Sequence, residues 1–261
     1  MLRSELTAAL PARFVGEELG VWVPARETHQ YDGAAIPTDR QQPGLDCDQG
    51  TDHDTHHNTL HDPDTSWCWV VDPHDGTRDF LRGLRGSSVS VALLRDGVPV
   101  LGVVHAPMPP DCPPDLIAWA EGSGPLRRNG QALTRPLQDL PLHPGARVLL
   151  SSSAARRPTT SAALVAPAQF VAMTSIAYRL ARVAAGDAVA TLTLHGAQSW
   201  DIAAGHALLR GAGGILLDDA AQPIRYAADG IGAVRACFGG TPKAARELAL
   251  RKEAWKLASI D

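Results

Sequence analysis

Two carboxylates three residues apart stand where a predicted buried strand gives way to a turn. Asp72 and Asp75 follow the run 67–71, which is short, aromatic and β-branched and is therefore typical of a buried strand. Pro73 and Gly76 favour a turn here, so both carboxylates would emerge together at the end of the strand. Oxygen-rich turns of this kind suit hard divalent cations such as Mg²⁺. The alternative is an ordinary Asp-Pro/Asp-Gly turn that caps a helix, and the turn taken alone favours that alternative.

A helix start is predicted directly after this turn. Its free backbone N–H groups and the helix dipole would favour an anion such as phosphate. Metal-binding carboxylates beside a phosphate site are what metal-assisted phosphoryl transfer requires. A third carboxylate, Asp201, opens a second helical pattern that the glycine-rich stretch 211–214 ends. Asp201 would lie near the N-terminus of that helix and could reach the same site.

The two motifs together resemble the paired signatures of the inositol monophosphatase family. The first is D-P-H-D-G-T at 72–77, and the second is W-D-I-A-A-G at 200–205, followed by A-G-G at 212–214. The helical pattern 175–187 also resembles the family helix before the second signature, so the likeness covers residues 67–240. The resemblance implies a Mg²⁺-dependent, lithium-sensitive phosphatase. The family acts on inositol phosphates, sugar phosphates and 3′-phosphonucleotides.

The resemblance also implies a role for each candidate site residue. The ligands of two or three Mg²⁺ ions would be Glu17, which begins the family's G-E-E tripeptide at 16–18, together with Asp72, Asp75, Asp201 and the backbone carbonyl of His74. Thr77 would hold the attacking water, and Glu17 and Asp75 would complete the catalytic group. The substrate would be bound by Gly76 and Thr77 through their amides, and by Arg78 and Ser175.

The remaining pattern predicts mixed α and β structure. In the first half we expect a helix at 4–10, a strand at 13–15, a hairpin of strands 88–94 and 99–104 across the Arg-Asp-Gly turn at 95–97, a strand at 116–120 and a turn at 128–131. In the second half we expect strands at 147–150, 215–217 and 233–238, a loop at 151–158 and helices at 175–185, 201–210 and 241–257. By resemblance the fold is an α+β or α/β layered sandwich (αβαβα), N-terminally shortened. Its halves are 1–140, with the metal turn, and 141–261, with the second motif.

Two features depart from the family pattern. Few residues precede the G-E-E tripeptide, where family members carry a helix pair, so either those helices are lost or the chain starts late. The spacer 24–66 is much longer than usual, is rich in Asp, Pro, Gly, Thr and Gln, and has no apolar periodicity, which predicts a mobile loop. His53, His57 and His61 would align on a helix and could bind a transition metal. Helix formers are scarce there, so a solvated loop is favoured.

Composition narrows the class of protein. The chain has 261 residues, 44% of them hydrophobic, which suffices for a substantial core, and its net charge of −4 argues against nucleic-acid or acidic-membrane binding. No apolar run approaches membrane-spanning length and no signal pattern opens the chain, so we expect a soluble cytoplasmic protein. The four cysteines have no C-x-x-C spacing and are expected to be reduced thiols. A homodimer is possible, since the family contains both dimers and monomers.

The substrate prediction depends on two positions. G-T-R-D-F at 76–80 is closer to the pattern of 3′(2′),5′-bisphosphate nucleotidases than to that of inositol-selective relatives, and Leu194 stands where the latter place a glutamate. A leucine cannot accept hydrogen bonds from a polyol. Arg78 could face a second phosphate, and an exposed pairing with Asp79 or Glu121 is an equal alternative. We expect a preference for 3′-phosphoadenosine 5′-phosphate or a similar bisphosphate. The alternatives are an inositol-1-phosphate or sugar phosphatase, and a catalytically impaired phosphatase-like binding protein, which Gly211 in place of the usual glutamate favours. The serine triplet 151–153 lacks a G-x-S-x-G context for a nucleophile.

Overall fold

The computed structural model describes residues 2–18, 20–22, 67–135 and 137–251. Contacts between residues divide the chain into two units. One is residues 25–63; the other is residues 1–24 and 64–261, and it contains every described residue. The predicted mobile spacer, with its three candidate metal-binding histidines, and Cys47 lie outside the described residues. Within the described residues, no helix combines the length and the apolar character needed to cross a membrane.

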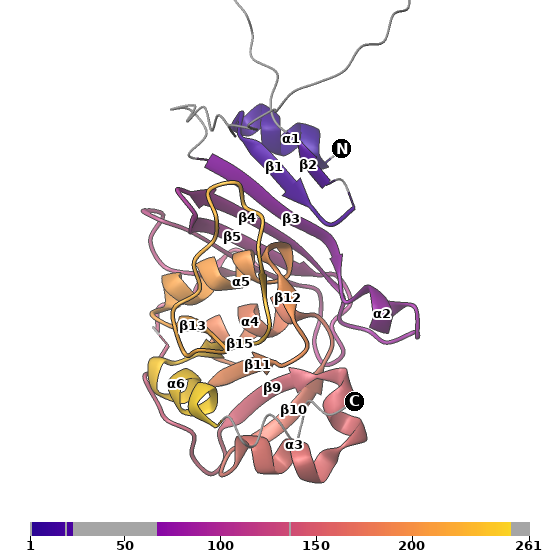
Figure 1. Ribbon diagram of the computed structural model, residues 1–261, viewed down its shortest axis with the longest axis vertical. Coiled ribbons are helices and arrows are strands. Elements are labelled where there is room, and N and C mark those ends of the chain that lie inside the picture. Colours follow the sequence, from indigo (N-terminus) through magenta and orange to yellow (C-terminus); the bar gives the residue numbers. More distant parts are fainter. Residues whose placement is uncertain (1, 19, 23–66, 136, 252–261) are drawn as a thin grey trace, which may run out of the picture. The chain divides into compact units, whose positions relative to one another are not determined.

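A large sheet forms one side of this unit (Figure 1). Its strands run in the spatial order β2-β1-β3-β4-β5-β6-β7-β8, and only the pairing of β1 with β3 is parallel. The bounds are β1 Arg13–Gly16, β2 Gly20–Trp22, β3 Trp67–Asp75, β4 Ser88–Arg95, β5 Val98–Ala106, β6 Asp115–Ala120, β7 Arg127–Arg128 and β8 Gln131–Ala132. The predicted hairpin is confirmed as β4–β5. Its turn has φ of 52° at Asp96 and 71° at Gly97, two positive values that suit Asp-Gly.

A second, smaller sheet has the order β10-β9-β11-β15-β13. Its first three strands are parallel, and β15 runs antiparallel to both of its neighbours. The bounds are β9 Arg147–Ser151, β10 Gln169–Met173, β11 Ala190–Thr193, β13 Ile215–Asp218 and β15 Cys237–Gly240, and a separate pair joins β12 Ala197–Gln198 to β14 Ala233–Val234. The helices are α1 Leu2–Ala9, α2 Thr77–Phe80, the 3₁₀ helix η1 Ser152–Arg156, α3 Pro158–Val165, α4 Ile176–Ala184, α5 Ser199–Ala212 and α6 Pro242–Leu250.

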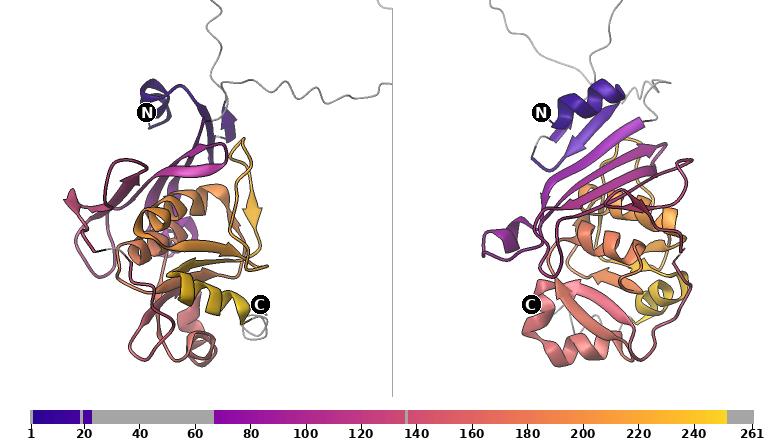
Figure 2. Two further views of the ribbon diagram at one scale, coloured as in Figure 1. Left: turned by 90° about the vertical axis from the view of Figure 1, so that its left-hand side faces the viewer. Right: turned by 180° about the vertical axis from the view of Figure 1, so that it is seen from behind.

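The main core lies between the two sheets, where α4 and α5 are sandwiched (Figure 2). Val104 from β5, Leu180 from α4 and Leu208 from α5 belong to one buried cluster with residues of the small sheet. The two helices approach closely because α5 has a glycine where they meet: a Cβ on Gly205 would lie 2.4 Å from the Cβ of Leu180. Burial of these apolar faces, at about 25 cal/mol per Å², is the dominant stabilising contribution.

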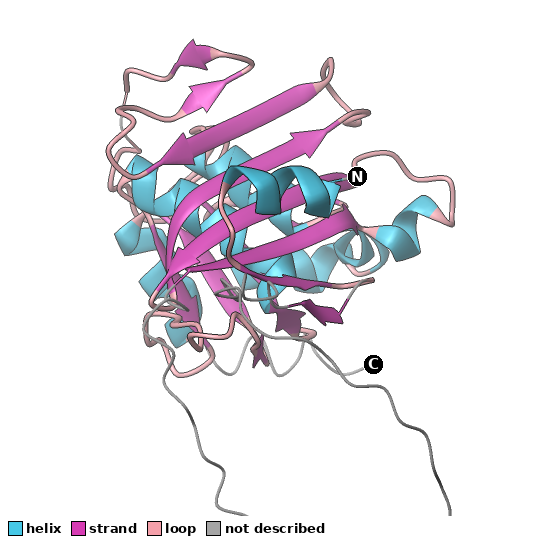
Figure 3. Cartoon of the chain, turned by 90° about the horizontal axis from the view of Figure 1, so that it is seen from above, coloured by secondary structure: helices cyan, strands magenta, loops and turns pink. Residues whose placement is uncertain are grey.

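The outer face of each sheet is covered by further helices. Figure 3 shows a helix, α1, lying over the outer face of the large sheet. Leu6 of this helix packs against the buried Phe14 and Trp69. On the small sheet, Leu164 of α3 and Leu248 of α6 belong to a separate buried cluster. The layers are therefore helix, sheet, helices, sheet, helices, which confirms the predicted αβαβα sandwich. The division into an N-terminal and a C-terminal half stays a prediction.

Several element boundaries differ from expectation. The strand predicted to end at residue 71 continues as β3 to Asp75, with irregular register where proline supplies no N–H to the ladder. The single strand predicted at 233–238 is wrong, because β14 and β15 belong to different sheets. The loop predicted at 151–158 contains η1, and the pattern missed β2, β10, β11, β12 and α3. The predicted helix 241–257 is seen as α6, with Thr241 as N-cap, but it ends at Leu250 with Arg251 as C-cap; residues 252–257 lie outside the described part.

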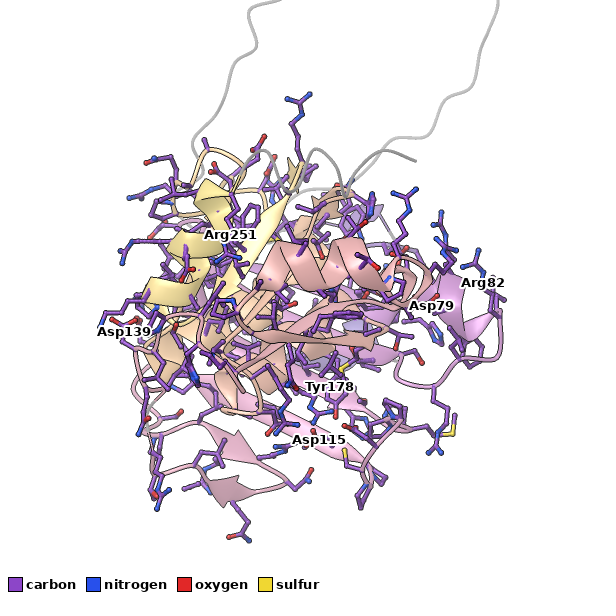
Figure 4. The ribbon with its side chains drawn as sticks, turned by 90° about the horizontal axis from the view of Figure 1, so that it is seen from below. Asp79, Arg82, Asp115, Asp139, Tyr178 and Arg251 are labelled. Carbon is purple, nitrogen blue, oxygen red and sulfur yellow. The ribbon has the colours of Figure 1, made fainter. Side chains whose placement is uncertain are left out.

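A network of charges ties the large sheet to α4. Arg128 donates to Asp115 at 2.7 Å and to Asp187 at 2.9 Å, and Arg182 donates to Asp187 at 2.7 Å. The hydroxyl of Tyr178 donates to Asp115 at 2.8 Å, and both residues are labelled in Figure 4. Burial alone would raise the pKa of Asp187, but the two arginines outweigh it and lower that pKa below its usual value. Near this network, Cys112 is free, as are the buried Cys68 and Cys237, which confirms the prediction for the three described cysteines.

Candidate metal centre and adjoining cavity

Asp72, Asp75 and Asp201 form a group with ligand geometry. One carboxylate oxygen of each can be chosen so that all three atoms lie within 4.8 Å of one another. Asp72 and Asp75 come from the irregular end of β3, where they pair with Ser90 and Ser88 of β4, and they are 1% and 6% exposed. The irregular end of β3 therefore places both carboxylates inside the protein.

Asp201 reaches the group because α5 begins beside β4. It is the third residue of that helix, and its Oδ2 accepts a hydrogen bond at 2.7 Å from the N–H of Gln198, the N-cap residue. The hydroxyl of Ser90 donates to the carbonyl of Trp200 at 3.0 Å, which fixes the start of α5 against β4. These contacts bring the second sequence motif to the first.

Asp75 is held by the N-terminus of α4. Its Oδ2 accepts hydrogen bonds from the hydroxyl of Ser175 at 2.6 Å and from the N–H of Ala177 at 2.7 Å. Ser175 is the N-cap of α4 and has a φ of 51°, and its hydroxyl also accepts from the N–H of Tyr178 at 2.9 Å. Three helix or strand ends, those of β3, α4 and α5, thus converge on one carboxylate group.

The electrostatics of the group favour a bound cation. Burial, reinforced by the charge of Asp75, raises the pKa of Asp72 to about 8 and that of Asp201 to about 7. Burial also raises the pKa of Asp75, although its hydrogen bonds from Ser175 and Ala177 oppose the change. Three carboxylates that repel one another would regain their charged form once a divalent cation lay between them. The donor set consists of oxygens, which fits a hard ion such as Mg²⁺.

The other predicted metal and catalytic residues lie around this group. Glu17 follows β1 and is exposed; its charge raises the pKa of Asp72. The N–H of His74 donates to Oδ1 of Asp72 at 2.8 Å, and the carbonyl of His74 accepts the hydroxyl of Thr77 at 2.8 Å. The ring of His74 packs edge-on against Phe80, and among the described residues its buried Nε2 has no hydrogen-bond partner. The side chain of His74 therefore packs against Phe80, while its backbone N–H and C=O bind Asp72 and Thr77.

A cavity of about 550 Å³ adjoins the carboxylates, and Asp75 lines it. Of the predicted substrate-binding residues, Gly76, Arg78 and Ser175 line this cavity, whereas Thr77 is not among its described lining residues. Leu194, the position that distinguishes inositol-selective relatives, lines it too.

Of the five arginines that line this cavity, the sequence patterns identified only Arg78, and Arg82 of the segment after α2 is one of the four others. Arg156 and Arg157 enter from the end of η1, and the buried Arg179 enters from α4. For Arg179 a signal was available, because it lies four residues after Ser175 and so on the same face of the helix. For Arg156 and Arg157, only their position just after the serine triplet 151–153 pointed to the site.

Comparison with known proteins agrees with this geometry. A family model described as "Inositol monophosphatase family" matches residues 28–255. The chain is 35% identical over 171 residues to the probable inositol 1-monophosphatase ImpA of Mycobacterium tuberculosis, covering 61% of this chain and 60% of the relative. It is 32% identical over 160 residues to the 3′(2′),5′-bisphosphate nucleotidase CysQ of Aggregatibacter actinomycetemcomitans, covering 60% and 58%.

Solved structures show the same fold. Inositol monophosphatase II from Staphylococcus aureus superposes with a TM-score of 0.65 at 20% identity, covering 98% of this chain and 81% of that one. The inositol monophosphatase from Anabaena (Nostoc) gives 0.64 at 20% identity, covering 98% and 83%. The aligned region nevertheless spans less than two thirds of the curated relatives named above.

Proposed function

Because the chain belongs to the inositol monophosphatase family, we propose that it is a metal-dependent phosphatase acting on a small phosphorylated metabolite. The observation that supports this most strongly is the convergence of Asp72, Asp75 and Asp201, with ligand atoms within 4.8 Å of one another, beside a cavity of about 550 Å³. Raised pKa values at these carboxylates are typical of functional sites.

In this proposal the three aspartates hold Mg²⁺, and Glu17 and the carbonyl of His74 are further ligands. A bound divalent cation lowers the pKa of water and offsets the charge of phosphate. Thr77 holds the water through its hydroxyl, which already donates to the adjacent carbonyl of His74, and Glu17 lies near enough to influence Asp72 and Asp75 electrostatically.

The remaining residues of the proposal position the reacting groups. Asp75 is the catalytic carboxylate most firmly placed, since Ser175 and Ala177 both hydrogen-bond it. The amides of Gly76 and Thr77 bind the reacting phosphate, and Arg78 and Ser175 face the rest of the substrate. Preorganised donors of this kind contribute to catalysis because they need no rearrangement as charge develops.

For the substrate we propose a bisphosphate such as 3′-phosphoadenosine 5′-phosphate. Leu194 and Arg78 both line the cavity, so an inositol ring would meet an apolar wall where its hydroxyls need acceptors. The relative named as a bisphosphate nucleotidase supports this choice. A second candidate, an inositol-1-phosphate phosphatase, is favoured by the relative named as a probable inositol 1-monophosphatase.

The test is phosphate release from both compounds at equal Mg²⁺, with and without Li⁺. We expect kcat/KM to be higher for 3′-phosphoadenosine 5′-phosphate and Li⁺ to inhibit. A higher value for inositol 1-phosphate would replace the substrate proposal and leave the phosphatase proposal intact. Tight binding of either compound without any release would instead indicate a binding protein that does not turn over.

A further inference from the structure

The lining of the cavity is more cationic than the proposed metal chemistry requires. Five arginines face it, and their sources are α2 with the segment after it, the end of η1 and α4; they are Arg78, Arg82, Arg156, Arg157 and Arg179. Only two carboxylates, those of Asp75 and Asp79, belong to the same lining, and Asp75 is assigned to the metal group. A surplus of positive charge therefore surrounds the space that a substrate would fill.

Some of this charge is already used within the protein. Arg179 is 2% exposed and donates to the carbonyl of Leu192 and to the hydroxyl of Thr193, both at 3.0 Å, so its role is structural. Arg82 pairs with Asp79 at 4.0 Å. Arg78 and Arg156 differ: both are exposed, and within the described ranges neither forms an ion pair with a carboxylate.

A long-range hydrogen bond brings the elements that carry these two arginines together. The hydroxyl of Ser152, the first residue of η1, donates to Oδ2 of Asp79 on α2 at 2.6 Å. Arg78 precedes Asp79, and Arg156 ends η1. Asp79, labelled with Arg82 in Figure 4, is already engaged by Ser152 and Arg82. The two arginines thus enter one cavity from two elements that contact each other.

We propose that Arg78 and Arg156 form a subsite for a second phosphate of the substrate, distinct from the phosphate that reacts at the aspartates. This inference rests on the proposed phosphatase function and deepens it. Guanidinium groups bind phosphate through paired, charge-assisted hydrogen bonds, and Arg is favoured over Lys for this geometry. Two cations held in one cavity repel each other, and a phosphate dianion between them removes that cost. The subsite would explain why the cavity carries arginines where the hydroxyls of an inositol would need hydrogen-bond acceptors.

The test compares matched substrates in the Arg156→Gln variant. One pair is adenosine 3′,5′-bisphosphate and adenosine 3′-phosphate, and the other is fructose 1,6-bisphosphate and fructose 1-phosphate, so the two pairs separate nucleotide from sugar scaffolds. We expect the ratio of kcat/KM for bisphosphate over monophosphate to fall about tenfold for the scaffold that the enzyme prefers. Arg225→Gln is the matched control, because Arg225 is exposed and does not line the cavity; its ratio should equal that of the unaltered protein.

If the ratio is unchanged in Arg156→Gln, including the case in which kcat/KM falls equally for both members of each pair, the proposed subsite is refuted. A binding measurement separates this outcome from failure of the phosphatase proposal. Calorimetry in EDTA should show adenosine 3′,5′-bisphosphate binding about tenfold more weakly to Arg156→Gln than to Arg225→Gln, even if no substrate is hydrolysed. Equal affinity of the two variants would refute the subsite on its own.

Discussion

Replacing Asp72 by asparagine should stabilise the metal-free protein at pH 8, although it removes a proposed ligand. Asp72 is 1% exposed, and burial together with the charge of Asp75 raises its pKa from 3.8 to about 8. At about 1.4 kcal/mol for each tenfold change in proton affinity, keeping this group charged costs about 6 kcal/mol at and above pH 8. The largest part of this cost comes from the burial of the charge, and the rest is repulsion that Asp72 shares with its neighbours, so we expect about half of the total, roughly 3 kcal/mol, as the gain.

The structure indicates that asparagine fits the site. Its side-chain oxygen can accept the hydrogen bond that Oδ1 of Asp72 now accepts from the N–H of His74 at 2.8 Å. The assay is urea unfolding in EDTA at pH 8 and pH 6. Since the folded state binds the proton of Asp72 more tightly than the unfolded state does, stability is lost as pH rises toward 8. The unaltered protein should therefore gain about 2 kcal/mol between pH 8 and pH 6, and the variant less.

Two results would refute this reasoning. One is a variant that is less stable than the unaltered protein at pH 8 in EDTA. The other is an unaltered, metal-free protein whose stability falls between pH 8 and pH 6. Addition of Mg²⁺ provides the control, because it should stabilise the unaltered protein at pH 8 more than the variant.

The remaining predictions concern catalysis and packing. Asp201→Asn should reduce phosphate release at least about 100-fold, because a metal ligand is lost. Its circular dichroism should stay unchanged, because the substitution eases repulsion among the buried carboxylates. Ser175→Ala removes the hydroxyl that donates to Asp75, so the Mg²⁺ concentration for half-maximal activity should rise about tenfold. Arg128→Met removes the ion-pair partner of the buried Asp115 and one of the two arginines that pair with Asp187, and should cost about 3–5 kcal/mol in urea unfolding. The neighbouring, exposed Arg127→Met should cost less than about 1 kcal/mol, and equal losses would contradict the network's role.

The candidate metal group was accessible from sequence because its parts are encoded locally. Strand-like residues followed by Asp72 and Asp75, and a helix start at Asp201, each follow from short patterns. That the two motifs meet was inferred from the family resemblance. In the structure the meeting depends on the packing of α5 against β4, including the bond from Ser90 to Trp200, which no local pattern contains.

What the sequence concealed depends on long-range packing. The end of β3 lies four residues later than predicted because pairing with β4 resumes at Asp75 after the proline. The parallel strands β10 and β11 are short, and both pair with β9. Their strand propensity alone was too weak to predict them. Arg156 gains its position from the contact between Ser152 and Asp79, which lie 73 residues apart.

The most direct test of the central claim is phosphate release by EDTA-dialysed protein as Mg²⁺ is returned, with adenosine 3′,5′-bisphosphate as substrate and Asp201→Asn measured in parallel. We predict no release in EDTA, saturable recovery with Mg²⁺, and no recovery in the variant at the same concentrations. Release that persists in EDTA, or a variant that recovers as the unaltered protein does, would contradict a metal centre formed by Asp72, Asp75 and Asp201.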